Sequence, residues 1–319
     1  MTSQKSVIVG DIGGTNGRLA LATFNQGSPM PVIGEMHTYL SADFAGLSPM
    51  IGAFIEEAGL PKGLSAKIAI AGPTCGQTGH LTNLDWHEDA SQIKSTLSLS
   101  EMGFLNDFGA LAYAAGYLTE PHTMSIKGGT PVEGAPISVM GPGTGFGVAQ
   151  LLKVDGKFHV ISTEGGHVSY APVTKLEEDL CQYLRREDEH VSVETLMSGA
   201  GLQRIHRFLV DYAGSGNAEL RPAEISAAAI DGSEPSCQRA VQVFLSILGS
   251  IAGDMVLAHG GRGGVFFGGG ILPKIVALLD KSDLASRFVS KGPMRGYLED
   301  VPVNLIVSPN AALIGAAVA

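Results

Sequence analysis

Two short segments rich in glycine and threonine have the composition of phosphate-binding turns. They span residues 10–16 (GDIGGTN) and 141–147 (GPGTGFG), and Thr15 and Thr144 lie 129 residues apart. A turn without side chains can direct several backbone N–H groups at one small volume, and such a volume binds phosphate oxygens. Each segment alone is also typical of an ordinary hairpin turn. Their repetition, together with a third glycine run at 268–270, favours phosphate binding.

Two carboxylates stand where they could take part in that chemistry. Asp11 lies within the first turn, directly after the apolar residues 7–9, and a carboxylate there can hold Mg²⁺ directly or through water. Asp107 follows a short apolar run and precedes the Ala-rich, helix-like segment 108–118. It is therefore either a helix N-cap or a base at the end of a strand, where ligands bind in open α/β sheets.

Other well-known catalytic motifs are missing from the sequence. The glycine spacing of residues 141–147 is not G-x-G-x-x-G, and Gly156-Lys157 is followed by Phe158, so there is no Walker A motif. The sequence also lacks H-E-x-x-H and G-x-S-x-G. These absences disfavour nicotinamide binding, P-loop catalysis, zinc proteolysis and serine hydrolysis.

The elements that must position these residues also repeat. Each glycine turn joins two apolar stretches, which is typical of a strand, a tight turn and a returning strand. Two copies at a domain-sized spacing, in a chain of 319 residues, predict two duplicated halves facing each other across a cleft. Further strands are expected at 67–71, 264–267 and 303–307, and helices at 108–118, 176–186, 239–258, from about 273, and 309–319. This alternation predicts an α/β protein.

Charge and composition exclude several classes of protein. The net charge is −10 and Lys and Arg are not clustered, so we expect no nucleic-acid partner. The three cysteines, Cys75, Cys181 and Cys237, are odd in number, far apart and without a C-x-x-C pair, so we expect neither a disulfide framework nor a zinc ribbon. The first residues lack a secretory apolar region, and stretches such as 311–319 are shorter than the roughly 20 residues that span a bilayer. We therefore expect a soluble cytoplasmic protein without a membrane partner.

At this point the sequence resembles a known family. Residues 10–16 and 141–147 look like the two phosphate loops of sugar kinases in the actin, hexokinase and heat-shock chaperone ATPase superfamily. Residues 105–108 (LNDF), 164–167 (EGGH) and 192–199 (SVETLMSG) are similar to bacterial glucokinases. Residues 168–172 (VSYAP), directly after the EGGH segment, contain no cysteine, whereas the repressor-and-kinase branch of the superfamily carries a cysteine-rich zinc site there. The chain therefore resembles the zinc-free bacterial glucokinases.

This resemblance implies a fold and an activity. The fold would be two ribonuclease-H-like α/β domains of the actin and hexokinase type flanking a cleft. We expect the smaller domain to contain residues 1–115 and 306–319, and the larger domain residues 116–305. The implied activity is ATP-dependent phosphorylation of D-glucose to glucose 6-phosphate, the first step of glycolysis.

The resemblance also assigns roles to individual residues. Asp107 would be the general base. The sugar would be bound by Asn83, Asn106, Asp107, Glu164, His167 and Glu194. ATP would be bound by Gly10, Asp11, Ile12, Gly13, Gly14, Thr15, Gly143, Thr144, Gly145 and Gly269. Asp11 would also hold Mg²⁺, directly or through water.

Several alternatives remain open at this stage. On its residues alone, the Glu164 and His167 pair also fits a local salt bridge, and Glu194 fits a first-turn helix carboxylate after Ser192. The glycines at 268–270 fit tight strand–helix packing as well as an approach to adenosine. At the level of function, the alternatives are a kinase of another hexose, a non-catalytic sugar-sensing protein and a chaperone-like or filament-forming ATPase. Polyphosphate as the donor and a homodimeric assembly also remain open.

Overall fold

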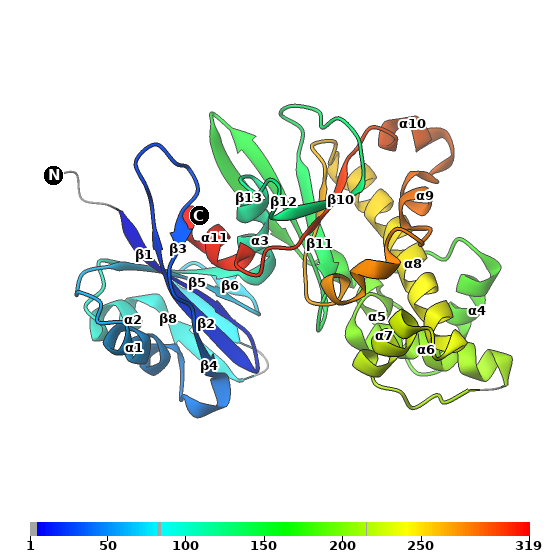
Figure 1. The fold of residues 1–319 in the computed structure, drawn as a ribbon, viewed down its shortest axis with the longest axis horizontal. Helices are drawn as coiled ribbons and strands as arrows, with labels where there is room; N and C mark the ends of the chain where they lie inside the picture. Colours follow the sequence, from blue (N-terminus) through cyan, green and yellow to red (C-terminus); the bar gives the residue numbers. More distant parts are fainter. Residues whose placement is uncertain (1–4, 82–83, 215) are drawn as a thin grey trace. The chain divides into compact units, whose positions relative to one another are not determined.

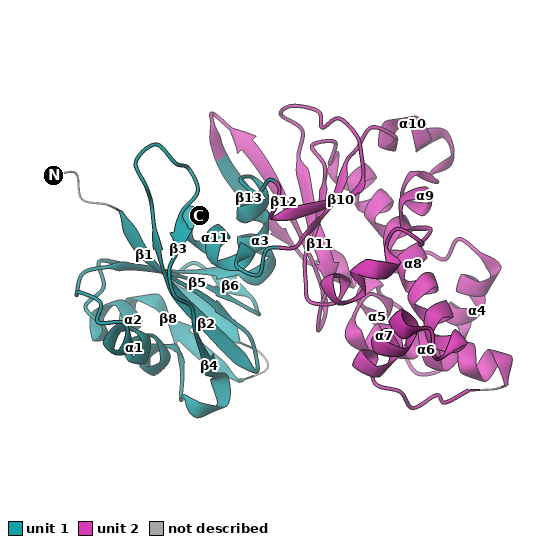
Figure 2. Cartoon of the chain, in the orientation of Figure 1, with its two compact units in different colours: residues 1–119, 158–160, 308–319 teal, residues 120–157, 161–307 magenta. Residues whose placement is uncertain are grey.

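The computed structural model describes residues 5–81, 84–214 and 216–319, which form two compact α/β units (Figure 1). Unit 1 takes in the chain up to residue 119, residues 158–160 and residues 308–319, and unit 2 takes in 120–157 and 161–307 (Figure 2). The boundaries expected from the sequence, after residues 115 and 305, differ from these by a few residues. No sequence feature had marked 158–160 as part of unit 1.

The sheet of unit 1 carries the first glycine turn. β1 and β2 form an antiparallel hairpin, and β5 and β9 follow β1 as parallel strands in the order β3-β2-β1-β5-β9, with β4 also paired to β2. The strands are β1 (Ser6–Ile12), β2 (Asn16–Thr23), β3 (Val32–Ile33), β4 (His37–Leu40), β5 (Ser65–Ile70) and β9 (Glu101–Asn106). A separate three-stranded sheet contains β6 (Thr74–Cys75), β7 (Thr78–Leu81) and β8 (Trp86–Asp89).

The sheet of unit 2 repeats this arrangement around the second glycine turn. β11 and β12 form the hairpin, and β14 and β15 follow β11 as parallel strands in the order β13-β12-β11-β14-β15, with β10 added antiparallel to β15. The strands are β10 (Thr123–Lys127), β11 (Ile137–Pro142), β12 (Phe146–Val154), β13 (Lys157–Thr163), β14 (Val265–Phe267) and β15 (Val303–Ile306). The expected repetition of one supersecondary unit is therefore confirmed.

Helices cover the sheets of both units. Unit 1 has α1 (Leu47–Glu57), α2 (Ala90–Thr96), α3 (Asp107–Ala115), α11 (Ala311–Val318) and the 3₁₀ turn η1 (Ser41–Asp43). Unit 2 has α4 (Lys175–Leu184), α5 (Val193–Leu196), α6 (Gly199–Ala213), α7 (Pro222–Asp231), α8 (Pro235–His259), α9 (Leu284–Val289), α10 (Arg295–Leu298) and the 3₁₀ segments η2 (Gly165–His167), η3 (Leu272–Leu278) and η4 (Gly292–Met294). The α-helix expected from about residue 273 is instead η3, which is kinked at Ile275.

The strand before the first glycine turn is buried on both faces. Val7 and Val9 of β1 belong to a core cluster with α11, and Ile8 and Ile12 belong to a second cluster with α1 and α2. α11 also packs closely on α3, because a Cβ at Gly315 would overlap the carbonyl oxygen of Ala110. The position of β1 and the start of α3 are therefore fixed by packing on several sides.

α8 is the central helix of unit 2. Among the described residues it is the one helix long and apolar enough to cross a membrane. However, 78% of its most apolar 18-residue stretch is buried inside the protein. Fifteen of its residues, including Phe244, Leu248 and Val256, are buried. The helix is therefore accounted for as the core of unit 2.

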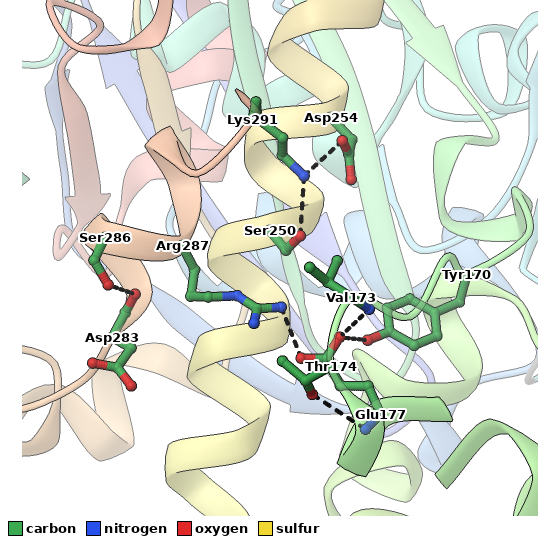
Figure 3. Close-up of polar contacts among 10 residues, drawn as sticks. All are labelled: Tyr170, Val173, Thr174, Glu177, Ser250, Asp254, Asp283, Ser286, Arg287 and Lys291. Atoms are coloured by element: carbon green, nitrogen blue, oxygen red, sulfur yellow. Dashed lines mark hydrogen bonds and ion pairs between the residues drawn. The ribbon is translucent and has the colours of Figure 1, made fainter. Parts of the chain in front are cut away.

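A buried polar network joins α4, α8 and α9 (Figure 3). Glu177, which is 4% exposed, accepts hydrogen bonds from the Tyr170 hydroxyl (2.7 Å), the Val173 N–H (2.8 Å) and Arg287 (2.7 Å). Two residues beyond the end of α9, Lys291 donates to Ser250 and pairs with the exposed Asp254 of α8. The network holds the segment that follows η2, and η2 carries part of the predicted sugar site.

Candidate active site

The first glycine turn has a fixed shape. The N–H of Gly13 donates to the carbonyl of Asn16 across the turn (2.9 Å). Ser41 donates from its hydroxyl to the carbonyl of Gly13 and from its N–H to that of Thr15, both at 2.9 Å. Thr15 is exposed, whereas Gly10 and Ile12 are buried strand residues. Gly13, Gly14 and Thr15 are therefore the part of the predicted phosphate loop that a ligand can reach.

The second glycine turn is held by two helices. The N–H of Gly143 donates to the carbonyl of Gly145 (2.8 Å), and the carbonyl of Gly143 accepts from Gly199 at the start of α6 (3.0 Å). Glu194 of α5 accepts the N–H of Phe146 directly after the turn (2.7 Å). A Cβ at Gly145 would overlap the Glu194 carboxylate, so a larger residue there would force that carboxylate to move. Thr144 at the tip is exposed.

The third glycine run packs against the second turn. The N–H of Gly268 donates to the carbonyl of Met140 (2.9 Å), and a Cβ at Gly269 would overlap the carbonyl oxygen of Pro142. Gly269 also has a φ of +84°, which favours glycine. These glycines therefore have a structural reason in close backbone packing, beside any role toward a ligand.

Unit 2 contains a cavity of about 600 Å³ beside this pair of turns. Its volume lies within the range of small-molecule and cofactor sites. Two basic residues, Arg221 and Lys274, contribute to a lining that is otherwise mostly small and apolar. The full lining is Gly143, Thr144, Gly199, Leu202, Arg221, Pro222, Ala223, Ser226, Gly270, Ile271 and Lys274. Gly269, which was predicted from the sequence, lies next to this wall, and Gly270 and Ile271 form it.

Sequence reasoning missed most of these lining residues. Arg221 and Pro222 begin α7, and Arg221 pairs with Glu224 one turn later. Proline as the first residue of a helix is a sequence feature that indicates where a helix begins. It does not indicate a ligand-binding residue. The fold alone brings α7 to the second turn.

Asn106 and Asp107 occupy the junction between β9 and α3. The side-chain oxygen of Asn106 accepts from the N–H groups of Phe108 (3.1 Å) and Gly109 (3.2 Å), so Asn106 is the N-cap of α3. Its amide nitrogen donates to the carbonyl of Gly72 (3.3 Å). Asp107 is therefore not the cap, although its Oδ1 accepts from the N–H of Phe108 (2.9 Å).

The carboxyl group of Asp107 has an unusual proton affinity. Burial, together with the negative charge of Asp11, raises the pKa of Asp107 to about 6, against the opposing effect of backbone hydrogen bonds. The register explains why Asp11 is near: Ile12 pairs with Ile70, and Ile70 pairs with Asn106, so β1 and β9 end at the same edge of the sheet. A carboxyl with this pKa is ionised at neutral pH and retains basicity.

Asp11 is engaged by a cation within its own hairpin. It lies directly opposite Arg18 across β1 and β2, and its Oδ2 forms an ion pair with the Arg18 guanidinium. Arg18 also donates to the carbonyl of Pro309 (3.0 Å). Mg²⁺ at phosphate sites takes one or two carboxylates and otherwise water and phosphate oxygens. A half-buried carboxylate pair formed by Asp11 and Asp107 fits that requirement, with Oδ1 of Asp11 left for the ion or its water.

The EGGH segment forms a 3₁₀ turn. Gly165 and Gly166 are buried against β12, where a Cβ at Gly166 would overlap the carbonyl oxygen of Phe146. This packing leaves Glu164 and His167 exposed, with Oε2 and Nε2 4.0 Å apart. The pair is thus a weak local ion pair whose atoms are accessible to a ligand. Neither residue is needed to support the fold.

The structure brings the predicted residues together in two groups. Unit 1 contains the first turn, Asp11, Asn106 and Asp107, and unit 2 contains the second turn, Glu164, His167, Glu194 and Gly269. Glu194 contacts the second turn directly, which the sequence did not indicate. Asn83 lies outside the described residues.

Comparisons with known proteins identify the family of this chain. A model of the glucokinase family matches residues 8–319. The chain is 38% identical over 310 residues to a glucokinase of Saccharophagus degradans, covering 97% of this chain and 96% of that protein. A glucokinase of Escherichia coli is 37% identical over 311 residues, covering 98% and 95%.

Solved structures show the same similarity. The structure of a glucokinase from an Antarctic psychrotroph matches with a TM-score of 0.90 and 41% identity, covering 98% of both chains. A ROK family glucokinase from Streptomyces griseus in complex with glucose and AMPPNP shares the fold, with a TM-score of 0.66 at 19% identity and coverage of 99% of this chain and 98% of that one. The expected hexokinase-type fold is confirmed. The chain belongs to the glucokinase family and is an enzyme that transfers a phosphoryl group from ATP to D-glucose.

Proposed function

We propose that this glucose phosphorylation uses Asp107 as the general base. Asp107 accepts the proton of the sugar 6-hydroxyl while the oxygen attacks the γ-phosphorus of ATP in line. The observation that carries this proposal is the raised pKa of Asp107, about 6, at a strand end where Asn106 already caps the helix. Oδ1 of Asp107 accepts from the N–H of Phe108, and in this proposal its Oδ2 accepts the proton of the sugar.

ATP binding is assigned to the glycine turns and the cavity of unit 2. The nucleoside would occupy the cavity between Pro222 and Ile271, and the phosphates would lie on Gly13, Gly14 and Thr15 and on Gly143, Thr144 and Gly145. Arg221 and Lys274 supply positive charge to the cavity wall. Asp11 would hold Mg²⁺ through Oδ1, directly or through water, because its Oδ2 is engaged by Arg18. When bound, Mg²⁺ supplies neutralisation of phosphate charge.

Glucose binding is assigned to five described side chains and to Asn83. Asn106 can both donate and accept hydrogen bonds, which suits a hydroxyl that does both. Glu164 and His167 are exposed, and Glu194 uses Oε2 for its hydrogen bond with Phe146, so in this proposal Oε1 contacts the sugar. In this proposal Asn106 and Asp107 contact the reacting end of the sugar, and Glu164, His167 and Glu194 contact its other hydroxyls.

The cellular setting follows from the same reaction. We propose that the protein works in the cytoplasm, in the first step of glycolysis, without a membrane or nucleic-acid partner. The burial of α8 inside unit 2 and the net charge of −10 support this setting. We propose that the protein forms a homodimer, and the molar mass from light scattering tests this.

An assay of ADP release against a panel of hexoses tests the proposal. We expect turnover with glucose to exceed that with mannose and fructose. Asp107→Asn should lower kcat by about 10²- to 10⁴-fold, the range for a positioned general base, while the protein stays folded. A variant with normal kcat and a lowered Tm would contradict the assignment of the base. ATP turnover that is independent of sugar would favour the chaperone-like ATPase instead.

A further inference from the structure

Three metal-ligating side chains meet on the small sheet of unit 1. β7 and β8 pair antiparallel, and His80 stands directly opposite His87 in their register. The two imidazole rings are stacked, with centroids 4.1 Å apart and planes 10° from parallel. Asp85 precedes β8, and its Oδ1 lies 3.4 Å from Nε2 of His87 and 3.8 Å from Nε2 of His80. Two imidazoles and a carboxylate thus lie beside one another.

The spacing of these atoms fits a bound metal ion better than it fits hydrogen bonds. The separation of 3.8 Å is too long for a hydrogen bond, and Nε2 of His80 is shielded from solvent with no hydrogen-bond partner among the described residues. One ligand atom from each residue lies within 4.8 Å of the other two. Ligands around a tetrahedral ion with bonds of about 2.0–2.1 Å stand roughly 3.4 Å apart. Because the two ring planes are nearly parallel, one imidazole must turn out of the stack before both Nε2 atoms can bind the same ion, and the exposed side chain of His87 is the one that can turn.

The donor atoms indicate the class of ion. Imidazole nitrogen suits Zn²⁺, Ni²⁺ and Cu²⁺, whereas Mg²⁺ and Ca²⁺ prefer an all-oxygen set. Three protein ligands leave at least one position for water. Asp85 and His87 are strongly exposed, so an ion can reach them from solvent. We propose that His80, Asp85 and His87 form a binding site for Zn²⁺ or a similar transition-metal ion, separate from the Mg²⁺ used with ATP.

The site has a short connection to the catalytic strand end. The N–H of His80 donates to the carbonyl of Pro73 (3.1 Å), and the carbonyl of the preceding Gly72 accepts from the side chain of Asn106. A Cβ at Gly72 would overlap the carbonyl oxygen of His80, so the two backbones are in close contact. The proposed ligand His80 therefore contacts the backbone at Gly72, and Gly72 in turn accepts the hydrogen bond from Asn106.

Trp86 provides a direct measurement of this binding. It is the single tryptophan of the chain and lies between Asp85 and His87. Ni²⁺ quenches a nearby indole, whereas Zn²⁺ has a filled d shell and does not. We expect one equivalent of Ni²⁺ to quench Trp86 emission in a saturable way, with Mg²⁺ in excess and no nucleotide present. An excess of Zn²⁺ added afterwards should displace Ni²⁺ and restore the emission.

Matched variants decide whether the three residues are the ligands. His80→Asn, His87→Asn and Asp85→Asn should each weaken Ni²⁺ binding by at least about tenfold, since even indirect partners of metal ligands contribute that much. His159→Asn, at an exposed histidine of β13, and Cys75→Ser, at the exposed cysteine of β6, should bind Ni²⁺ as the unmodified protein does.

The exposed Asp85 and His87 make their variants informative even if His80→Asn does not fold. Unchanged Ni²⁺ affinity in both Asp85→Asn and His87→Asn would overturn the proposal. An equal loss in His159→Asn or Cys75→Ser would also overturn it, because binding would then be spread over the surface. Failure of glucose phosphorylation in any of these variants has no bearing on this test, which needs no turnover.

Discussion

The carboxylate of Glu194 accepts a hydrogen bond of 2.7 Å from the backbone N–H of Phe146. Glu194 was predicted to contact the sugar, and Phe146 follows the turn predicted to contact phosphate. One side chain in α5 therefore has a second task, because it fixes the shape of the second glycine turn. Within unit 2, this hydrogen bond connects the predicted sugar site to the predicted phosphate-binding turn.

Two substitutions of Glu194 separate its predicted contact with the sugar from its contact with the turn. Glu194→Gln keeps an oxygen that can accept from Phe146, so we expect weaker glucose binding and nearly unchanged binding of an ATP analogue. Glu194→Ala removes the acceptor and leaves a buried N–H unpaired, at a cost of about 1–3 kcal/mol. It should therefore weaken both ligands, by roughly 5- to 150-fold. Calorimetry with each ligand measures this. Unchanged analogue binding by Glu194→Ala would show that the turn holds its shape without Glu194.

The raised pKa of Asp107 sets a pH dependence of both activity and stability. In the proposed mechanism the base must be ionised, so kcat/KM for glucose should fall about tenfold per pH unit below about pH 6. Stability has the opposite dependence, because the folded protein binds this proton more tightly than the unfolded chain. The folded state therefore loses stability as the pH rises from about 4 to about 6, by at most about 3 kcal/mol.

Asp107→Asn separates the two effects. This variant should be inactive at pH 7 yet have a higher Tm than the unmodified protein, and the difference in Tm should vanish near pH 4. Thermal unfolding across that pH range measures it. If Asp107→Asn were less stable at pH 7, the carboxylate would have a stabilising partner, and the explanation of its pKa by burial would be wrong.

Arg287 should matter for stability far more than its sequence context suggests. It is the partner of the buried Glu177, and its removal would leave that carboxylate without a counter-charge (Figure 3). We expect Arg287→Met to lower the free energy of unfolding by about 3–5 kcal/mol. Arg295→Met is the matched control, because its pair with Glu299 is exposed on α10 and should contribute little. Adding Glu177→Gln to Arg287→Met should restore part of the loss. Equal effects at 287 and 295 in denaturant unfolding would contradict this account.

Gly315 should be required for activity although it lies in the last helix of the sequence. A methyl group there would overlap the carbonyl of Ala110, so Gly315→Ala should displace α3 and with it Asp107. We expect both Tm and kcat to fall. Gly296→Ala, in the open space of α10, is the control and should leave both unchanged or slightly improved. A normal kcat in a destabilised Gly315→Ala would mean that α3 keeps its place.

The sequence predicts local features of this protein well. The glycine turns with their flanking strands, α8 and the strand before Asp107 all follow from apolar runs and glycine spacing, which act over a few residues. Features that depend on distant segments could not be predicted. The cavity wall at Arg221 and Lys274 comes from α7 and η3, and the link from Glu194 to Phe146 joins residues 48 apart.

For some predicted residues, the residue type alone could not show which structural role each of them has. Asn106 was expected to contact sugar and Asp107 was the candidate cap, whereas the structure gives the capping to Asn106. The engagement of Asp11 by Arg18 depends on the exact register of β1 with β2, which fixes Asp11 opposite Arg18. Such assignments follow from geometry at the ångström scale, which spacing in the sequence does not encode.

The packing of α11 on α3 has a consequence for how the protein is made. Ribosomes add about 5–20 residues per second, so roughly 10–40 s separate the synthesis of Asp107 from that of α11. During this interval the nascent chain has α3 and the first hairpin but lacks the helix that covers them both, with Val7, Val9 and Ala110 uncovered. The packing of unit 1 is therefore completed only after unit 2 has been synthesised, and α3, which begins at the proposed base Asp107, gains its contacts with α11 only when residues 311–318 have emerged.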